Sequence, residues 1–84
     1  MKTSGNTYLI TGGGSGIGRE LAREFHALGN TVIVAGRTAS SLEETIDGRN
    51  DMHARTLDVQ DAADISRFAK ALIEDFPSLN VLFN

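Results

Sequence analysis

The chain has 84 residues, of which 40% are hydrophobic and 23% are charged, and its formal net charge is −3. This composition is typical of a globular domain and argues against intrinsic disorder, which requires low hydrophobicity and high net charge. The sequence contains no cysteine, which excludes a disulfide framework and a thiolate metal site. The acidic balance also lacks the basic footprint of a nucleic-acid-binding protein. We therefore expect one small domain with no nucleic-acid partner.

Neither a membrane segment nor a secretory signal is visible in the sequence. The longest uninterrupted apolar run, residues 32–35, is far too short to span a bilayer. The first six residues lack the apolar stretch that a secretory signal requires. These features predict a cytoplasmic protein with no membrane association.

Strand patterns and helix patterns alternate along the chain. A β-branched and aromatic run predicts a strand over residues 7–11, and the apolar run predicts one over residues 31–35 that is buried on both faces. Weaker patterns predict strands over residues 52–59 and 81–83. Alternating strands and helices are typical of right-handed βαβ units in a parallel sheet. We predict half of a doubly wound (Rossmann) α/β fold, with strand order 3-2-1-4 and helices on both faces.

Three helices are predicted between these strands. The first has an apolar stripe with a period of 3.6 and ends at Gly29-Asn30; the stripe consists of Ile17, Leu21, Phe25 and Leu28. A shorter helix is predicted over residues 39–46. Asp61 is the predicted N-cap of the third helix, whose apolar residues run from Ile65 to Phe76.

A glycine-rich turn separates the first strand from the first helix. The first N–H groups of a helix have no intrahelical acceptor, and the helix dipole adds positive charge there, so an anion binds if no side chain obstructs it. Gly12 lets the strand turn sharply, Gly16 lets a pyrophosphate approach the backbone, and Gly18 lets the helix pack closely on the sheet. The alternative is a glycine-rich turn without a ligand.

Two common glycine fingerprints do not match this turn. The G-x-G-x-x-G pattern fails at its last position, and the P-loop pattern has Arg19-Glu20 where Lys-Ser or Lys-Thr is required. The pattern present is T-G-x-x-x-G-x-G over residues 11–18, which resembles the cofactor motif of the short-chain dehydrogenase/reductase family. The resemblance implies a dinucleotide-binding set in this turn: Gly12, Gly14, Ser15, Gly16, Ile17 and Gly18.

Further residues extend the resemblance and predict NADP as the cofactor, with NAD as the less favoured alternative. No acidic residue follows the second strand before Glu43, and Arg37 suits the 2′-phosphate of NADP better than the free ribose hydroxyls of NAD. The resemblance places Asp58 and Val59 at the adenine and Asn84 beside the adenosine ribose. A solvated surface arginine at position 37 and a turn or capping role for Asp58 are the alternatives.

The catalytic residues that the resemblance implies, a Ser and a Tyr-x-x-x-Lys pair, have no counterpart here. The single tyrosine, Tyr8, is followed four positions later by Gly12. We therefore expect residues 1–84 to be an incomplete dinucleotide-binding domain that ends after the fourth strand, from an oxidoreductase that transfers hydride. The alternative is a complete small nucleotide-binding module without catalysis. In either case we expect self-association through the edge at Leu79–Asn84.

Overall fold

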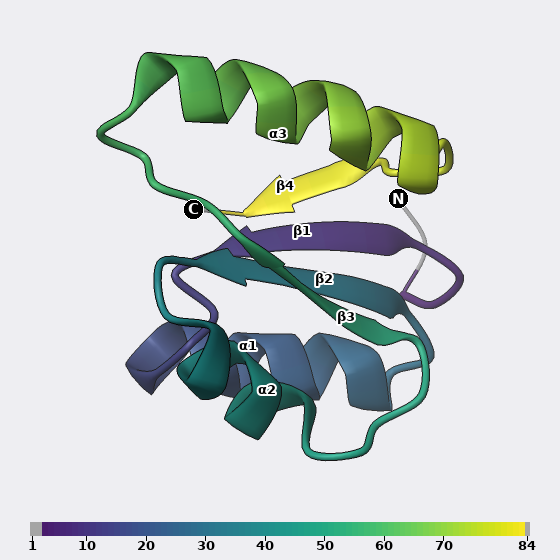
Figure 1. Cartoon of the computed structure of the whole chain (residues 1–84). Coiled ribbons are helices and arrows are strands. Elements are labelled where there is room, and N and C mark those ends of the chain that lie inside the picture. The colour runs from purple at the N-terminus through teal and green to yellow at the C-terminus, as the bar shows by residue number, and fades with distance from the viewer. Residues whose placement is uncertain (1–2, 84) are drawn as a thin grey trace.

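The computed structural model of the chain describes residues 3–83. They form four parallel strands in the order β3-β2-β1-β4, and the strands are β1 (Thr7–Thr11), β2 (Thr31–Gly36), β3 (Met52–Thr56) and β4 (Val81–Phe83). Helices α1 (Gly16–Ala27) and α2 (Ala39–Ile46) cover one face of the sheet, and α3 (Ala62–Asp75) covers the other (Figure 1). The predicted fold class and strand order are confirmed.

The two central strands carry the core because their side chains alternate between the two faces. Toward α1 and α2 they contribute Tyr8, Ile10, Val32 and Val34, which pack with Ala22, Leu42 and Met52. Toward α3 they contribute Leu9, Ile33 and Ala35, which pack with Leu57 and Leu72. Residues 32–35 are entirely buried, as expected for a central parallel strand.

Helix α1 uses only part of its predicted stripe. Ile17 is 79% exposed and Leu28 is 50% exposed, whereas Ala22 is fully buried and the Phe25 ring stacks on Tyr8 at 4.3 Å between centroids. The stripe prediction is therefore wrong at its two ends. The helix lies so close to the sheet that a small residue, Ala22, occupies the centre of the contact.

Strand β3 is shorter than predicted, because it ends at Thr56 rather than Val59. Leu57 turns inward and donates its backbone N–H to the carbonyl oxygen of Gly36 at 2.8 Å. Asp61 is the N-cap of α3, as predicted, and its carboxylate accepts from the N–H groups of Ala63 and Asp64. Among residues 3–83, no helix has both the length and the apolar character needed to cross a bilayer.

Three asparagines connect the strands at the edge where β1, β2 and β4 begin. The Asn30 amide oxygen accepts from the backbone and side chain of Asn6, and its NH₂ group donates to the carbonyl oxygens of Thr3 and Phe25. Asn80 donates to the Asn6 side chain and accepts from the N–H of Thr7. This network fixes the amino ends of the strands and leaves the functional side chains to the opposite edge.

Replacement of Asn30 tests the contribution of this network. Asn30→Ala removes four hydrogen bonds that this buried side chain makes among the described residues, two to Asn6 and one each to the carbonyl oxygens of Thr3 and Phe25. We expect the free energy of unfolding to fall by about 2 kcal/mol, because several hydrogen bonds at a buried site are lost together. Asn50→Ala is the control, because Asn50 is exposed and contributes only a backbone oxygen to a hydrogen bond. Equal urea midpoints for the two variants would show that the network adds no stability.

Candidate dinucleotide site

The predicted site residues gather at the edge of the sheet where β1, β2 and β3 end. This is the edge at which open parallel α/β sheets bind ligands, because the loops after the strands and the helix N-termini converge there. The turn between β1 and α1 lies beside the segment between β2 and α2 (Figure 1). The residues after β3 complete the edge.

Gly12 and Gly16 adopt backbone conformations that favour glycine. Their φ angles are +73° and +58°, and a Cβ atom built on either residue would have no atom within 4 Å. The backbone therefore follows a left-handed path beside open space at both positions. A substitution at Gly16 adds backbone strain of about 1–2 kcal/mol to any effect on a ligand, so Gly16 is a poor position at which to test binding alone.

Gly18 is required for a different reason, which is the close approach of α1 to the turn. A Cβ atom at Gly18 would overlap the carbonyl oxygen of Gly12 and would lie 3.2 Å from the Cα of Gly13. Even alanine therefore does not fit. The third motif glycine brings the first turn of α1 onto the end of β1, as the spacing predicted.

The amino end of α1 has no anionic group of its own. Its N-cap, Ser15, makes no side-chain hydrogen bond to the helix, and the first turn contains no acidic residue. The first N–H groups of a helix lack intrahelical acceptors and carry the positive end of the helix dipole. An anion such as a pyrophosphate fits this end of the helix.

Three cavities open along this edge, and Arg37 lines each of them. The first, of about 200 Å³, lies between the glycine turn and α2 and is lined by Gly12, Gly14, Ser15, Gly36, Arg37, Thr38, Ser41 and Leu42. The second, of about 240 Å³, is lined by Arg37, Thr56, Leu57, Asp58 and Asp64. The third, of about 250 Å³, is lined by Thr11, Gly12, Ala35, Gly36, Arg37, Leu57 and Val59.

Arg37 differs from the other arginines in its lack of partners. Every other arginine makes a hydrogen bond or an ion pair, and these are Arg19, Arg23, Arg49, Arg55 and Arg67. Within residues 3–83 the exposed Arg37 side chain makes neither. Its five N–H donors are available to a ligand, and a guanidinium binds phosphate oxygens in a bidentate manner.

The predicted adenine residues lie on the walls of two of these cavities. Val59 is 60% exposed, which leaves an apolar surface for a flat ring. One carboxylate oxygen of Asp58 accepts the backbone N–H of Gln60 at 3.0 Å, so this residue has the turn role that the sequence left open, while it also lines the second cavity. Asn84 lies outside the described residues.

The structure also identifies residues at the site that the sequence analysis did not include. Ser41 and Leu42 lie on the wall of the first cavity, and Leu57 lies on the walls of the other two. Their position follows from the path of α2 and of the segment after β3, which no local motif encodes. Thr38, the N-cap of α2, also lines the first cavity. The sequence signal for Thr38 was its position directly after Arg37.

The strand order and this edge are those of a doubly wound, Rossmann-like fold. The model of the short chain dehydrogenase family matches residues 6–84, and the chain belongs to that family. An uncharacterized oxidoreductase, DltE, of Bacillus subtilis is 40% identical over 84 residues, which are all of this chain and 33% of the relative. The chain thus spans about a third of that protein.

Solved structures support the same assignment. A 3-ketoacyl-(acyl-carrier-protein) reductase of Brucella melitensis complexed with NADH is 27% identical with a TM-score of 0.86, and the match covers 96% of this chain and 34% of the reductase. A short chain dehydrogenase/reductase of Burkholderia phymatum in complex with NAD is 28% identical with a TM-score of 0.85, over 98% of this chain and 31% of that protein. Both of these relatives bind a dinucleotide.

The residues of this chain fit such a cofactor. This edge presents glycine backbone beside open space, a helix amino end without an acid and, at Arg37 after β2, a cation without a partner among the described residues. The glycine turn and the helix end would hold the pyrophosphate, while the apolar wall at Val59 would hold the adenine.

A charge placed at Ser15 tests the anion site without loss of stability. Ser15→Asp introduces a good N-cap and an acid at the positive end of α1, so the melting temperature is expected to stay equal or rise. The same carboxylate repels a pyrophosphate, so NADPH binding measured by calorimetry is expected to fall by about tenfold or more. Ser15→Asn is the neutral control, since it caps the helix without a charge. Equal affinity of the Asp and Asn variants would contradict an anion site at this helix end.

Proposed function

We propose that this chain is the NADP-binding segment of an oxidoreductase that transfers hydride. The observation that carries the proposal is the unpartnered Arg37, which lines all three cavities at the carboxyl edge of the sheet. The 2′-phosphate that distinguishes NADP from NAD is an anion and requires a cation nearby, whereas the free ribose hydroxyls of NAD favour a carboxylate.

The charge of the segment after β2 favours NADP over NAD as the cofactor. It reads Gly36-Arg37-Thr38, and the first turn of α2 contains no acidic residue. The hydroxyl of Thr38 makes no capping hydrogen bond, so it is free to contact a phosphate beside Arg37. The solved reductase of Brucella melitensis holds NADH and that of Burkholderia phymatum holds NAD, so the support for NADP comes from the residues of this chain itself.

The remainder of the proposal concerns the whole protein. NADP supplies the hydride acceptor or donor when bound, and the residues described here bind and orient its adenosine diphosphate part. We propose that residues 1–84 are the first part of the dinucleotide-binding domain, because the chain spans about a third of its relatives. The residues that exchange a proton with the substrate belong to the longer protein. A cytoplasmic location stays a prediction from composition.

Arg37 substitutions test the cofactor preference. Arg37→Gln removes the charge and is expected to weaken NADPH binding by about one to two decades, the range for a hydrogen bond to a charged group, with little change for NADH. Arg37→Asp is expected to weaken NADPH binding more than Arg37→Gln does. It is also expected to raise the affinity for NADH, because its carboxylate can accept hydrogen bonds from the ribose hydroxyls. Calorimetric titration of each variant with NADPH, NADH, 2′-AMP and 5′-AMP measures both effects.

The control is Arg49→Gln, which removes the same charge beyond the carboxyl end of α2, and Arg49 lines none of the three cavities. Its preference for NADPH is expected to match that of the wild type. A wild-type chain that binds NADH more tightly than NADPH would contradict the role of Arg37. A wild-type chain that binds neither would contradict the proposed function.

We also propose that the 84-residue chain by itself associates through the segment Leu79–Phe83. Strand β4 pairs only with β1 among the described strands, and Leu82 on it is 63% exposed. Ile73, on the helix that covers the same face as Leu82, is 63% exposed as well. An unpaired strand edge with exposed apolar side chains and no charge favours pairing with another copy.

Leu82→Lys tests this association. A lysine on the strand edge opposes pairing, so we expect the dissociation constant measured by sedimentation to rise by about tenfold or more. Leu28→Lys is the matched control, because Leu28 is also exposed but lies at the end of α1. A wild-type chain that sediments as a monomer at all concentrations would contradict the proposal.

A further inference from the structure

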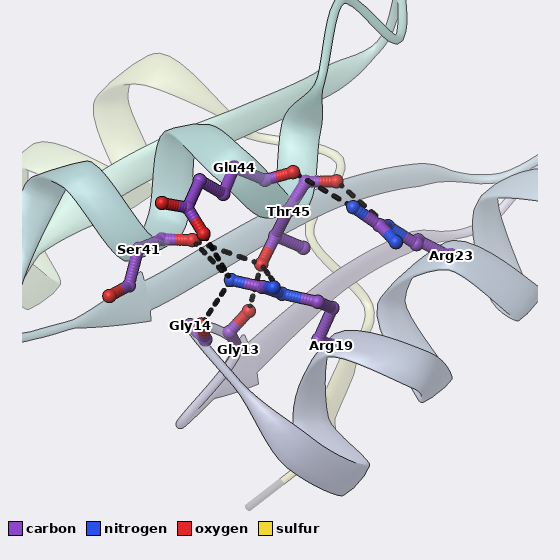
Figure 2. Close-up of polar contacts among 7 residues, drawn as sticks. All are labelled: Gly13, Gly14, Arg19, Arg23, Ser41, Glu44 and Thr45. Atoms are coloured by element: carbon purple, nitrogen blue, oxygen red, sulfur yellow. Dashed lines mark hydrogen bonds and ion pairs between the residues drawn. The ribbon is translucent and has the colours of Figure 1, made fainter.

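Helix α2 is bound to the glycine turn through a buried hydroxyl, that of Thr45. Figure 2 shows its hydroxyl directed from α2 toward Gly13 of the turn and toward Arg19 of α1. The Thr45 hydroxyl lies 2.7 Å from the carbonyl oxygen of Gly13 and accepts the Nε–H of Arg19 at 2.9 Å. Thr45 is fully buried, so no water replaces these partners. A buried residue of α2 thus holds the Gly13 carbonyl of the turn.

Arg19 holds the next carbonyl. Its Nη2 group donates to the carbonyl oxygen of Gly14 at 2.6 Å and to that of Ser41 at 3.0 Å. The carboxylate of Glu44 lies 3.5 Å away but is 71% exposed, and such a surface pair contributes little. The guanidinium therefore acts mainly through the backbone oxygens of the turn and of α2.

These contacts fix the direction of two peptide groups. The described chain has no cis peptide bond, and in a trans peptide the N–H points opposite to the preceding C=O. The carbonyls of Gly13 and Gly14 are held toward Thr45 and Arg19, so the N–H groups of Gly14 and Ser15 point the other way. Neither N–H has an acceptor within residues 3–83, so both are available to an anion at the start of α1.

We propose that Arg19 and Thr45 are positioning residues for the dinucleotide, which hold the glycine turn so that its N–H groups face the pyrophosphate. The inference rests on the proposed function and adds residues that touch no ligand. It assigns Arg19 a role through the geometry of its planar fork, since lysine carries the same charge on a single nitrogen and cannot reproduce the separate Nε and Nη2 donors that bind Thr45, Gly14 and Ser41.

Arg23 provides a matched control on the same helix. Its guanidinium donates to the carbonyl oxygens of Thr45 and Glu44, at 3.2 and 2.8 Å, and it reaches no atom of the turn (Figure 2). Both arginines tie α1 to α2, so the loss of either weakens the contact between the helices. Only the loss of Arg19 releases the turn.

The experiment compares NADPH with 2′-AMP in Arg19→Met, Arg19→Lys and Arg23→Met chains, each checked for folding by thermal denaturation. Because 2′-AMP has no pyrophosphate, it reports on the Arg37 end of the site alone. We expect both Arg19 variants to bind NADPH about tenfold or more weakly than Arg23→Met does, with 2′-AMP affinity unchanged in all three. Thr45→Val is expected to behave like Arg19→Met, and Thr45→Ser, which keeps the hydroxyl, to restore NADPH binding.

The outcomes distinguish a positioning role from a general structural role. If the Arg19 variants do not fold, the comparison of Thr45→Val with Thr45→Ser makes the same distinction. Equal losses in Arg19→Met and Arg23→Met, or parallel losses for NADPH and 2′-AMP, would show a general structural role and overturn the inference. If Arg19→Lys binds NADPH as tightly as the wild type does, charge alone suffices, and that result would also overturn the inference. A wild-type chain that binds no NADPH would overturn the proposed function itself, and this inference with it.

Discussion

The contact between Gly18 and the carbonyl of Gly12 is the constraint on which the site depends. Helix α1 begins so close to the end of β1 that no side chain fits between them. This approach directs the amino end of α1 at the space beyond the strand ends, and it makes the turn between them short and left-handed at Gly12 and Gly16. The same closeness explains why a small residue, Ala22, is the buried residue of the helix.

The polar groups of the glycine turn divide between folding and binding. The carbonyl of Ala35 accepts the N–H groups of Gly12 and Gly13, at 2.9 and 3.4 Å, which fixes the turn to β2. The carbonyls of Gly13 and Gly14 are fixed to α2 through Thr45 and Arg19. Among the described residues, the N–H groups of Gly14 and Ser15 have no acceptor, and an anion is the ligand that such donors bind.

The arginines near this edge also divide between those that stabilise the fold and one that is available to a ligand. Arg23 donates to backbone oxygens, and Arg19 donates to backbone oxygens and to the Thr45 hydroxyl, so both act as part of the scaffold. Arg37 stands on the segment that joins β2 to α2 with no partner among the described residues, beside all three cavities. An arginine that the fold does not use is the strongest argument for a phosphate at this point of the site.

Much of the fold was predictable because the local signals agree with the tertiary contacts. The glycine spacing, the buried run over residues 32–35, and the N-cap at Asp61 each correspond to an observed feature. The misassigned end of β3 had no such signal, because Leu57 leaves the strand to fill the core under α3. Ile17 and Leu28 matched the helical period, but a period does not show how far a sheet extends beneath a helix.

The candidate site was predictable where one motif encodes it and unpredictable where distant segments meet. The turn and Arg37 lie within short patterns. By contrast, the role of Arg19 depends on Ser41 and Thr45, more than twenty positions away, and in the sequence this arginine stood out only as a departure from the P-loop pattern. Contacts of this kind follow from the way α2 packs on the turn, which no local spacing encodes.

The most direct test of the account is a titration of the ¹⁵N-labelled chain with NADPH, followed by amide chemical shifts. The account predicts that the N–H signals of residues 14–17 shift together with those of Arg37 and Val59, while the signals of Asn30 and Asn80 at the opposite edge stay in place. Shifts confined to α3 and β4, or no shifts at millimolar NADPH, would contradict a dinucleotide site at the carboxyl edge of the sheet.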